Sequence, residues 1–197
     1  MNASRLEQQV RFSIEIDKLK GVDRQTLLTD GSRRENSVEH SWHIAVMASL
    51  LREYSRSPDL DVERVVRMVL IHDIVEIDAG DTYCYDEKTG RDRPERERKA
   101  ADRIFALLPP DQEREFRGLW EEFEEGRTAE SQFAAALDRL QPVIHNYCTG
   151  GRMWRENSIT RPQVMNRISP VKEAAPLLWE FVSTLIDDAV AKGFLSP

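Results

Sequence analysis

The spacing of hydrophobic residues predicts a chain built almost entirely of helices. Leu6, Val10 and Ile14 recur every four residues, and Phe12 widens the apolar face of this first predicted helix. No alternation of apolar and polar residues is long enough to predict a useful strand. Further helices are predicted over residues 37–55, 61–77, 95–108, 111–125, 128–148, 162–168 and 171–192. The pattern therefore favours an all-α fold, a single-domain helical bundle.

Three polar segments interrupt the helical pattern and are predicted to be loops. Residues 20–35, KGVDRQTLLTDGSRRE, lack periodicity and contain two glycines. Residues 80–94 are polar and irregular, and this length is typical of a functional loop or lid. Residues 148–160 contain the pair Gly150–Gly151 and separate the long 128–148 helix from the last two.

Composition and charge narrow the class of protein. With 197 residues, of which 40 % are hydrophobic and 32 % charged, the chain suits one soluble globular domain. No apolar run approaches the roughly 18 residues of a membrane helix, and the charged N-terminal stretch does not resemble a secretory signal. Two cysteines predict no disulfide framework, which favours a cytoplasmic location. A net charge of −7 argues against a nucleic acid polymer as partner but leaves room for a small anion pocket.

The most apolar predicted helix, 61–77, carries charged residues at its C-terminal end. The stretch VLIHDIVEIDAGD places His72, Asp73 and Glu76 there. An unpaired buried carboxylate is costly, so such groups normally pair or bind a metal. His72 and Glu76 share a helix face, whereas Asp73 is displaced by about 100°. These residues predict part of a metal site that needs ligands from other helices; a His–Asp pair buried in the core is the alternative.

Two other predicted helices offer candidates to complete such a site. ENSVEHSWH contains His40 and, one turn later, His43, which we interpret as packing or hydrogen bonding rather than ligation. FAAALDRLQPVIHNY embeds Asp138 in an apolar stretch, and Pro142 predicts a kink that would aim this carboxylate inward. His145 is interpreted as structural. Two imidazoles and two carboxylates suit Mn²⁺, Co²⁺, Fe²⁺, Ni²⁺ or Zn²⁺ better than Ca²⁺.

The order His, His–Asp, Asp within predicted helices resembles the HD-domain superfamily of metal-dependent phosphohydrolases. ENSVEHS, HDIVEIDAGD and ALDRL resemble three signatures of its 5′-deoxynucleotidase/HD-domain-containing protein 2 branch, and similarity runs from about residue 5 to 190. The resemblance implies a single HD domain over residues 1–197, in which the 80–94 and 148–160 loops border the site. It also implies a homodimer that hydrolyses a small phosphorylated substrate, a (deoxy)ribonucleoside 5′-monophosphate, by attack of a metal-bound water.

The family pattern implies a role for each matching residue. One divalent metal would be held by His40, His72, Asp73 and Asp138. Glu76 would be the catalytic acid that handles the proton of the attacking water or leaving oxygen, and Asp81 the acid near the sugar and leaving group. Arg24 would bind the phosphate, a task that suits its planar donor fork, with Arg33 and Arg34 as competing candidates.

The sequence is also compatible with two other functions. Gln25 stands where characterised members have a tryptophan near the sugar, which leaves the preference for a 2′-deoxy sugar open. A phosphodiesterase or other phosphoester hydrolase of the superfamily is one alternative, although binuclear members recruit extra histidines and only His43 and His145 are spare. A non-catalytic helical regulator stabilised by a metal is the other, and it would not need Glu76 or Asp81.

Overall fold

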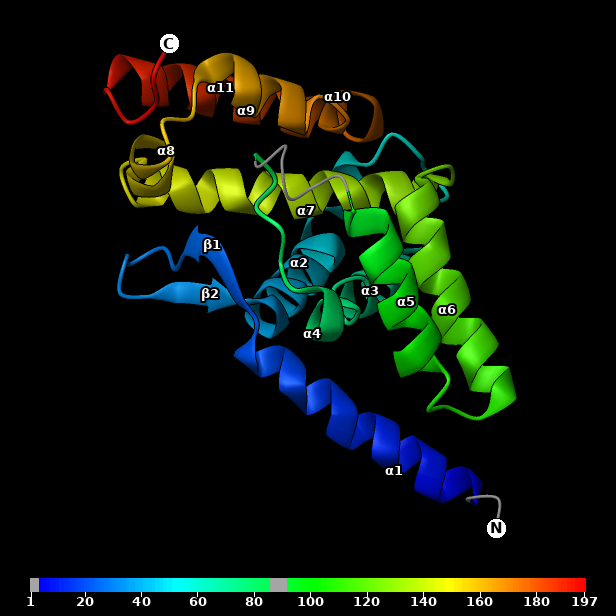
Figure 1. Ribbon diagram of the computed structural model, residues 1–197. Helices are drawn as coiled ribbons and strands as arrows, with labels where there is room; N and C mark the ends of the chain where they lie inside the picture. Colours follow the sequence, from blue (N-terminus) through cyan, green and yellow to red (C-terminus); the bar gives the residue numbers. More distant parts are fainter. Residues whose placement is uncertain (1–3, 86–91) are drawn as a thin grey trace.

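In the computed structural model, residues 4–85 and 92–197 are described, and they form a helical bundle with one small β-hairpin (Figure 1). The strands are β1 (Asp23–Leu27) and β2 (Arg34–Asn36). The α-helices are α1 (Arg5–Ile16), α2 (Ser37–Leu51), α3 (Val62–Ile71), α4 (Glu76–Ala79), α5 (Arg93–Phe105), α6 (Pro110–Glu125), α7 (Ala129–Cys148), α8 (Arg152–Glu156), α9 (Arg161–Ile168), α10 (Val171–Ala174) and α11 (Pro176–Ala191). Short 3₁₀ helices follow α1 (Asp17–Gly21) and α2 (Arg52–Tyr54). The predicted all-α class is confirmed.

Local sequence signals explain where the main helices begin. Asn36 accepts a hydrogen bond from the backbone of Glu39, whose side chain accepts one from the backbone of Asn36, so a capping box starts α2. Thr128 and Ser131 form a comparable reciprocal pair at the start of α7. These caps satisfy backbone groups that the first turn of a helix cannot pair by itself.

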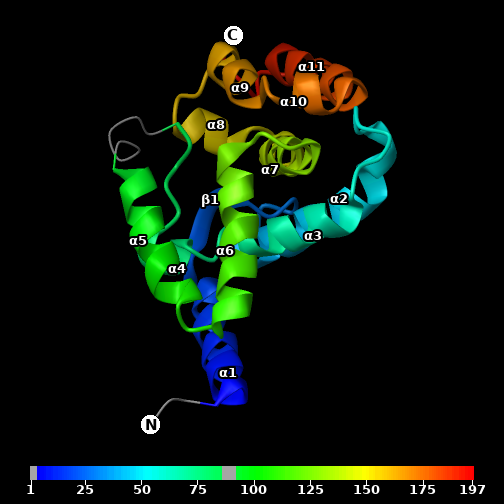
Figure 2. The same ribbon diagram turned by 90° about the vertical axis from the view of Figure 1, so that its right-hand side faces the viewer.

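Two hydrophobic cores meet at the end of α3. The larger core lies between α2, α3, α7 and the C-terminal helices, with Ile44, Met68 and Leu137 fully buried. The smaller one includes Ile71 and packs α1, α4, α5 and α6 around Phe105. Figures 1 and 2 show α7 running across the molecule, with α8–α11 on one side and α2 and α3 on the other. The end of α3 therefore lies where the two cores join, close to the middle of α7.

The loop prediction for residues 20–35 is wrong, because this segment contains the hairpin. β1 and β2 pair antiparallel, with Asp23 opposite Asn36 and Leu27 opposite Arg34. A turn closed by the backbone of Leu28 and Arg33 connects them, and Gly31 adopts a positive φ within it. Strands of five and three residues are too short to show alternation, and pairing with each other stabilises them.

Several predicted helix limits also differ from the structure. The predicted helix 61–77 is two helices, because the backbone turns at residues 72–75 between α3 and α4. The predicted helix 171–192 is divided before Pro176, and the predicted 148–160 loop contains the short helix α8. In the predicted 80–94 loop, residues 93–94 belong to α5, and 86–91 lie outside the described residues.

The predicted core face of the first helix is wrong. Leu6, Val10 and Ile14 are exposed to 69 %, 49 % and 66 %, whereas Phe12 is buried. Periodicity identifies an apolar stripe, but it does not say which element covers it. None of the described helices combines the length and the apolar character needed to span a membrane.

Candidate functional site

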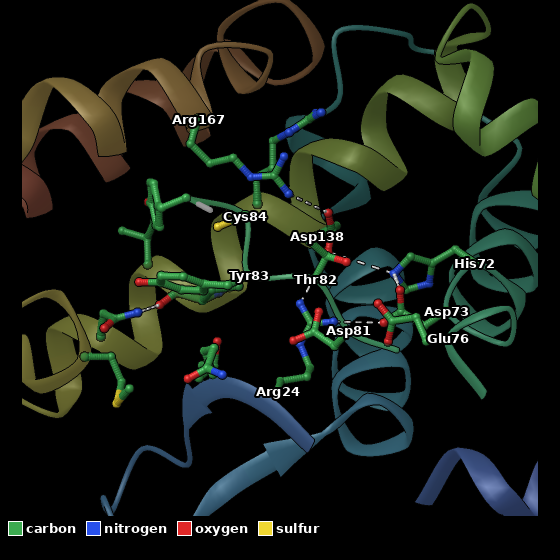
Figure 3. A pocket seen from close by; sticks show the side chains of 18 of the residues that line it. Arg24, His72, Asp73, Glu76, Asp81, Thr82, Tyr83, Cys84, Asp138 and Arg167 are labelled. Carbon is green, nitrogen blue, oxygen red and sulfur yellow. Dashed lines mark hydrogen bonds and ion pairs between the residues drawn. The ribbon is translucent and has the colours of Figure 1, made fainter. Parts of the chain in front are cut away.

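A pocket opens where the α3–α4 turn, β1, α7 and α9 come together (Figure 3). It contains about 910 Å³ of space between atoms, including its open mouth. Its wall includes His72, Asp73 and Glu76 from one short stretch of sequence, with Asp138 from α7. A concave pocket with convergent charged groups is the usual form of a binding or catalytic site.

The end of α3 brings His72, Asp73 and Glu76 into this pocket. The backbone N–H of Glu76 donates to the carbonyl of Asp73 at 2.9 Å, in a tight turn that replaces regular helix geometry. All three side chains are buried although each can carry charge. The sequence predicted these residues at the site but placed them within one continuous helix.

The tautomer of His72 leaves a bare nitrogen facing carboxylates. Its Nδ1 lies 2.7 Å from the carbonyl oxygen of Val69, which can only accept, so Nδ1–H donates. Nε2 then carries a lone pair and has no hydrogen-bond partner among the described residues. It lies 3.0 Å from Asp73 Oδ1 and 3.9 Å from Asp138 Oδ1. Acceptor atoms this close repel each other unless a positive charge lies between them.

His40 is arranged in the same way from the other side of the site. It is completely buried, and its Nε2 lies 3.0 Å from Asp138 Oδ1. Its Nδ1 lies 3.2 Å from Gln141 Oε1. The Gln141 amide is oriented by Glu35, which accepts a hydrogen bond from Gln141 Nε2 at 2.6 Å. Both ring nitrogens of His40 thus face acceptor oxygens, and in the tautomer whose Nδ1–H donates to Gln141 the Nε2 presents a lone pair toward Asp138.

These residues fit a divalent metal ion. Ligand atoms of His40, His72 and Asp73 lie within 4.8 Å of one another, and Asp138 Oδ1 lies within 4 Å of both imidazoles. Two unprotonated imidazole nitrogens with carboxylate oxygens suit a first-row transition metal. All four predicted ligand residues are thus brought together, and the helix that carries Asp138 runs unbroken from Ala129 to Cys148 across Pro142.

The charges of the site shift the pKa values of its members. Burial opposes charge on His72, but Asp73 and Asp138 outweigh burial and raise its pKa to about 9, so without a metal Nε2 takes up a proton in the position that a cation would occupy. Burial and the nearby Arg24 lower the pKa of His40 to about 4. Burial also opposes charge on Asp138, yet contacts with the two histidines hold its pKa well below its usual range. The carboxylates of Asp73 and Asp138 therefore favour a bound cation or proton next to them.

Glu76 differs from the four candidate ligands because it favours its protonated form. Burial, followed by the negative charges of Asp73 and Asp81, raises its pKa well above the ordinary value. Ser37 Oγ donates to Glu76 Oε2 at 2.7 Å and fixes the carboxyl group in place. Burial also raises the pKa of Asp81, against the opposing effect of Arg24. A buried carboxyl with a raised pKa can exchange protons near neutral pH.

Of the three candidate arginines, only Arg24 reaches the pocket. β1 positions it so that Nη1 lies 2.9 Å from Asp73 Oδ2 and Nη2 lies 3.9 Å from Asp138 Oδ1. Arg33 instead forms an exposed ion pair with Glu39 at 2.6 Å, and Arg34 is also exposed. Neither Arg33 nor Arg34 lines the pocket.

The pocket wall also contains residues that the sequence pattern did not single out. Tyr83 and Tyr85 pack edge to face with their ring centroids 5.4 Å apart. Phe123 packs against His72 with the ring centroids 4.7 Å apart. Arg139 and Arg167 line the wall near Asp138, and burial together with the charge of Arg167 lowers the pKa of Arg139. The only sequence signal for Arg139 was its position beside Asp138.

A second buried polar cluster lies behind His40. Ligand atoms of Glu35, His43 and His145 are also within 4.8 Å of one another. Here the Nε2 of Gln141 lies between them, 2.6 Å from Glu35 Oε1, 3.1 Å from His145 Nε2 and 3.4 Å from His43 Nδ1. Burial raises the pKa of Glu35 to about 7, although Arg24 and Gln141 oppose the shift. An amide donor thus occupies the position where a cation would contact these three groups.

The chain is similar to known proteins in sequence and in structure. The sequence matches the HD domain family over residues 16–179. It is 32 % identical over 130 residues to the human (Homo sapiens) protein named 5′-deoxynucleotidase HDDC2, which covers 66 % of this chain and 62 % of that protein. The mouse (Mus musculus) protein of the same name is 31 % identical over 136 residues, covering 68 % of this chain and 66 % of that protein.

A solved structure resembles nearly the whole chain. It is a crystal structure from Magnetospirillum magnetotacticum MS-1, described as a predicted metal-dependent phosphohydrolase, with 53 % sequence identity. The similarity covers 98 % of this chain and 97 % of that chain, with a TM-score of 0.95.

Proposed function

Because the chain belongs to the HD domain family, we propose that it is a metal-dependent phosphohydrolase that acts on small phosphomonoesters. The substrates proposed are (deoxy)ribonucleoside 5′-monophosphates, which is supported by the 5′-deoxynucleotidase names of its relatives. One observation carries the proposal: the Nε2 atoms of His40 and His72 both face Asp138 Oδ1, at 3.0 Å and 3.9 Å, an arrangement that a cation stabilises.

In this proposal one divalent ion, Mn²⁺, Co²⁺, Fe²⁺, Ni²⁺ or Zn²⁺, is held by His40, His72, Asp73 and Asp138. When bound, such an ion supplies Lewis acidity, which makes a coordinated water nucleophilic at neutral pH and polarises a phosphoryl oxygen. The hydrogen bonds of His72 to Val69 and of His40 to Gln141 hold both rings in the tautomer that presents Nε2.

The remaining residues act on the proton and on the phosphate. Glu76, fixed by Ser37, exchanges the proton of the attacking water or the leaving oxygen, and Asp81 assists beside the leaving group. Arg24 binds and neutralises the phosphate with its planar fork, and its place in the wall favours it over Arg33. Tyr83, lying over the pocket, helps to keep bulk water from the reacting group (Figure 3).

Three further properties belong to the same proposal. We infer a single HD domain across residues 1–197, supported by the family match to residues 16–179. We infer a homodimer, supported by the exposed Trp42, Val46 and Leu50 on one helix. A cytoplasmic location stays a prediction that depends on the two free cysteines.

The phosphodiesterase alternative has less support than the phosphomonoesterase. A second metal would require the spare residues Glu35, His43 and His145, and the Gln141 amide already donates among them. The regulator alternative predicts that the protein binds a metal but releases no phosphate, whereas an enzyme does both.

The test uses protein loaded with Mn²⁺ or Co²⁺ and a panel of deoxy- and ribonucleoside 5′-, 3′- and 2′,3′-cyclic phosphates, with phosphate release as the readout. Glu76→Gln is expected to bind the same amount of metal and to lose activity by about 100- to 10,000-fold, because it removes the proton-exchanging group. Glu173→Gln, an exposed Glu on α10, is the matched control and retains activity. A wild-type protein that binds metal and releases no phosphate from any compound would contradict the proposal.

A further inference from the structure

Among the described residues, two arginines on the α7–α9 side of the pocket lack the close ion pairs that Arg24 and Arg93, the other arginines of its wall, make. Arg139 follows Asp138 on α7, and Arg167 lies near the end of α9; both line the pocket. Figure 3 shows Arg167 on the side of Asp138 away from His72. The guanidinium group keeps its charge at any physiological pH, so each contributes a full positive charge to this wall.

Among the described residues, neither arginine makes an ion pair shorter than 3.7 Å. Within residues 4–85 and 92–197, the only hydrogen bond from the Arg139 side chain runs from Nη1 to the carbonyl of Ala135, at 3.4 Å. The only ion pair of Arg167 in the described part of the chain joins its Nη2 to Asp138 Oδ2 at 3.7 Å. Arg93, also in the pocket wall, instead contacts Glu97 at 2.6 Å.

The other acids of the wall do not supply the missing partner. Asp81 and Glu124 line the same pocket, but neither forms an ion pair with Arg139 or Arg167 among the described contacts. Arg139 and Arg167 line the same wall, and the charge of Arg167 contributes to the lowered pKa of Arg139, so the two cations repel each other and an anion bound between them relieves this repulsion.

The two oxygens of Asp138 face different groups of the pocket wall. Its Oδ1 faces His40, His72 and Arg24, which places the candidate metal and the reacting phosphate on that side. Arg167 approaches the other oxygen, Oδ2. A group held by Arg167 and Arg139 therefore lies on the opposite side of the carboxylate from the group that Arg24 and the metal would hold.

We propose that Arg139 and Arg167 form a second anion subsite, which binds a phosphoryl group of the substrate other than the one that is hydrolysed. The preferred substrates are then phosphomonoesters with two separate phosphoryl groups, a class that includes nucleoside 3′,5′-bisphosphates. The identity of the reacting group rests on the proposed function, whereas binding of the second group does not. Two adjacent donor forks suit the several oxygens of a phosphate.

Equilibrium binding tests the subsite without any turnover. Metal-free protein is titrated in a calorimeter with 2′-deoxyadenosine 5′-monophosphate and with 2′-deoxyadenosine 3′,5′-bisphosphate. The bisphosphate is expected to bind about tenfold more tightly or better, and Arg167→Gln and Arg139→Gln are each expected to abolish most of this preference. Arg161→Gln, on the same helix but paired with Asp187 at the surface, is the matched control and retains it. Equal binding of the two nucleotides by the wild type would overturn the subsite.

Kinetics with Mn²⁺-loaded protein separate the subsite from a direct role in the reaction. Arg167→Gln is expected to raise KM for the bisphosphate about tenfold while changing kcat/KM for p-nitrophenyl phosphate, which has one phosphate, by less than about twofold. An equal loss on both substrates would show that Arg167 acts on the reacting phosphate or supports the fold, and the subsite would be rejected. If no compound is hydrolysed but the calorimetric preference is present, the proposed function fails and the subsite stands.

Discussion

Two neighbouring polar clusters have nearly the same composition but different chemistry. One contains His40, His72 and Asp73, with Asp138 close by; the other contains Glu35, His43 and His145. In the first, the Nε2 atoms of His40 and His72 face carboxylate oxygens, and the described donor Arg24 binds the other oxygen of Asp73, Oδ2. In the second, the amide nitrogen of Gln141 lies among the acceptors and donates to them.

The distribution of hydrogen-bond donors, not the number of histidines and acids, distinguishes a cation site from a polar network whose members pair with one another. Buried acceptors need a positive partner, which can be an N–H or a metal. Gln141 supplies N–H groups to one cluster and only a carbonyl oxygen to the other. Gln141 therefore donates to the acceptors of the second cluster, whereas in the first cluster it accepts from His40 and leaves the carboxylates available to a cation.

The largest expected difference between the clusters comes from replacing one histidine in each. His72→Gln is expected to remove the metal and to lower phosphatase activity by on the order of a thousandfold, because a ligand atom is lost. His145→Gln is expected to keep one metal per chain and to change activity by only a few fold, since His145 Nδ1 donates to the carbonyl of Leu27 and lies outside the first cluster. Metal content by atomic emission and phosphate release measure both; equal metal loss in the two variants would mean that the clusters are not distinct.

The pH dependence of stability is the next largest effect, and it belongs to the second cluster. Glu35 has a pKa of about 7 in the folded protein and about 4.5 when unfolded, so the native state binds the extra proton. Its contribution to the free energy of unfolding is therefore fully present below pH 4.5 and is lost as the pH rises through 7, by at most about 3 kcal/mol. Glu35→Gln imitates the protonated group and should remove this decline.

The measurement is urea unfolding of metal-free wild type and Glu35→Gln from pH 5 to 8. The difference in the free energy of unfolding should shift in favour of the variant as the pH rises. Glu156→Gln, an exposed acid in an ion pair with Arg152, provides the control with no such slope. Parallel pH profiles for wild type and Glu35→Gln would place the titration elsewhere.

Gln141→Leu breaks the connection between the clusters and is expected to have an intermediate effect. It removes the acceptor that fixes the His40 tautomer and the donor that pairs with Glu35. Loss of such an orienting group typically weakens metal binding by about 10- to 100-fold. Competition with a chelating dye measures metal affinity, and ¹⁵N NMR of the imidazoles reports the His40 tautomer. Unchanged affinity with an altered tautomer would show that orientation of His40 is unimportant.

Sequence periodicity was sufficient to predict that most of the chain is helical, because helix formation depends on residues that are close together in the sequence. The pair His72–Asp73 and the single acid Asp138 were also recognisable, since charge within an apolar stretch is rarely accidental. The hairpin was missed because it depends on pairing between two short segments, and no glycine or proline marks the break after Ile71. The exposed stripe of Leu6, Val10 and Ile14 shows that periodicity does not reveal what covers a helix.

Long-range contacts account for what the sequence could not predict at the site. Glu35 and Gln141 are 106 residues apart, and nothing in either segment indicates that their side chains meet. Arg139 and Arg167 are polar residues on helices, which usually face solvent, and only the fold directs them to the pocket. The chemistry of individual residue types was predictable, whereas their partners were not.

The smallest expected effect concerns Arg33, which lies on the same hairpin as Arg24 but contacts neither cluster. Its guanidinium pairs with Glu39 at the surface, where solvent screens the interaction, so Arg33→Gln should leave kcat/KM within about twofold. Arg24→Gln, the same substitution at the other end of the hairpin, should raise KM by about tenfold or more, because Arg24 lies among Asp73, Asp138 and Glu35. Steady-state kinetics on one nucleotide compare the two variants directly. A larger loss for Arg33→Gln would mean that the phosphate-binding arginine comes from the hairpin turn. Arg24 on β1 would then no longer be assigned to the phosphate.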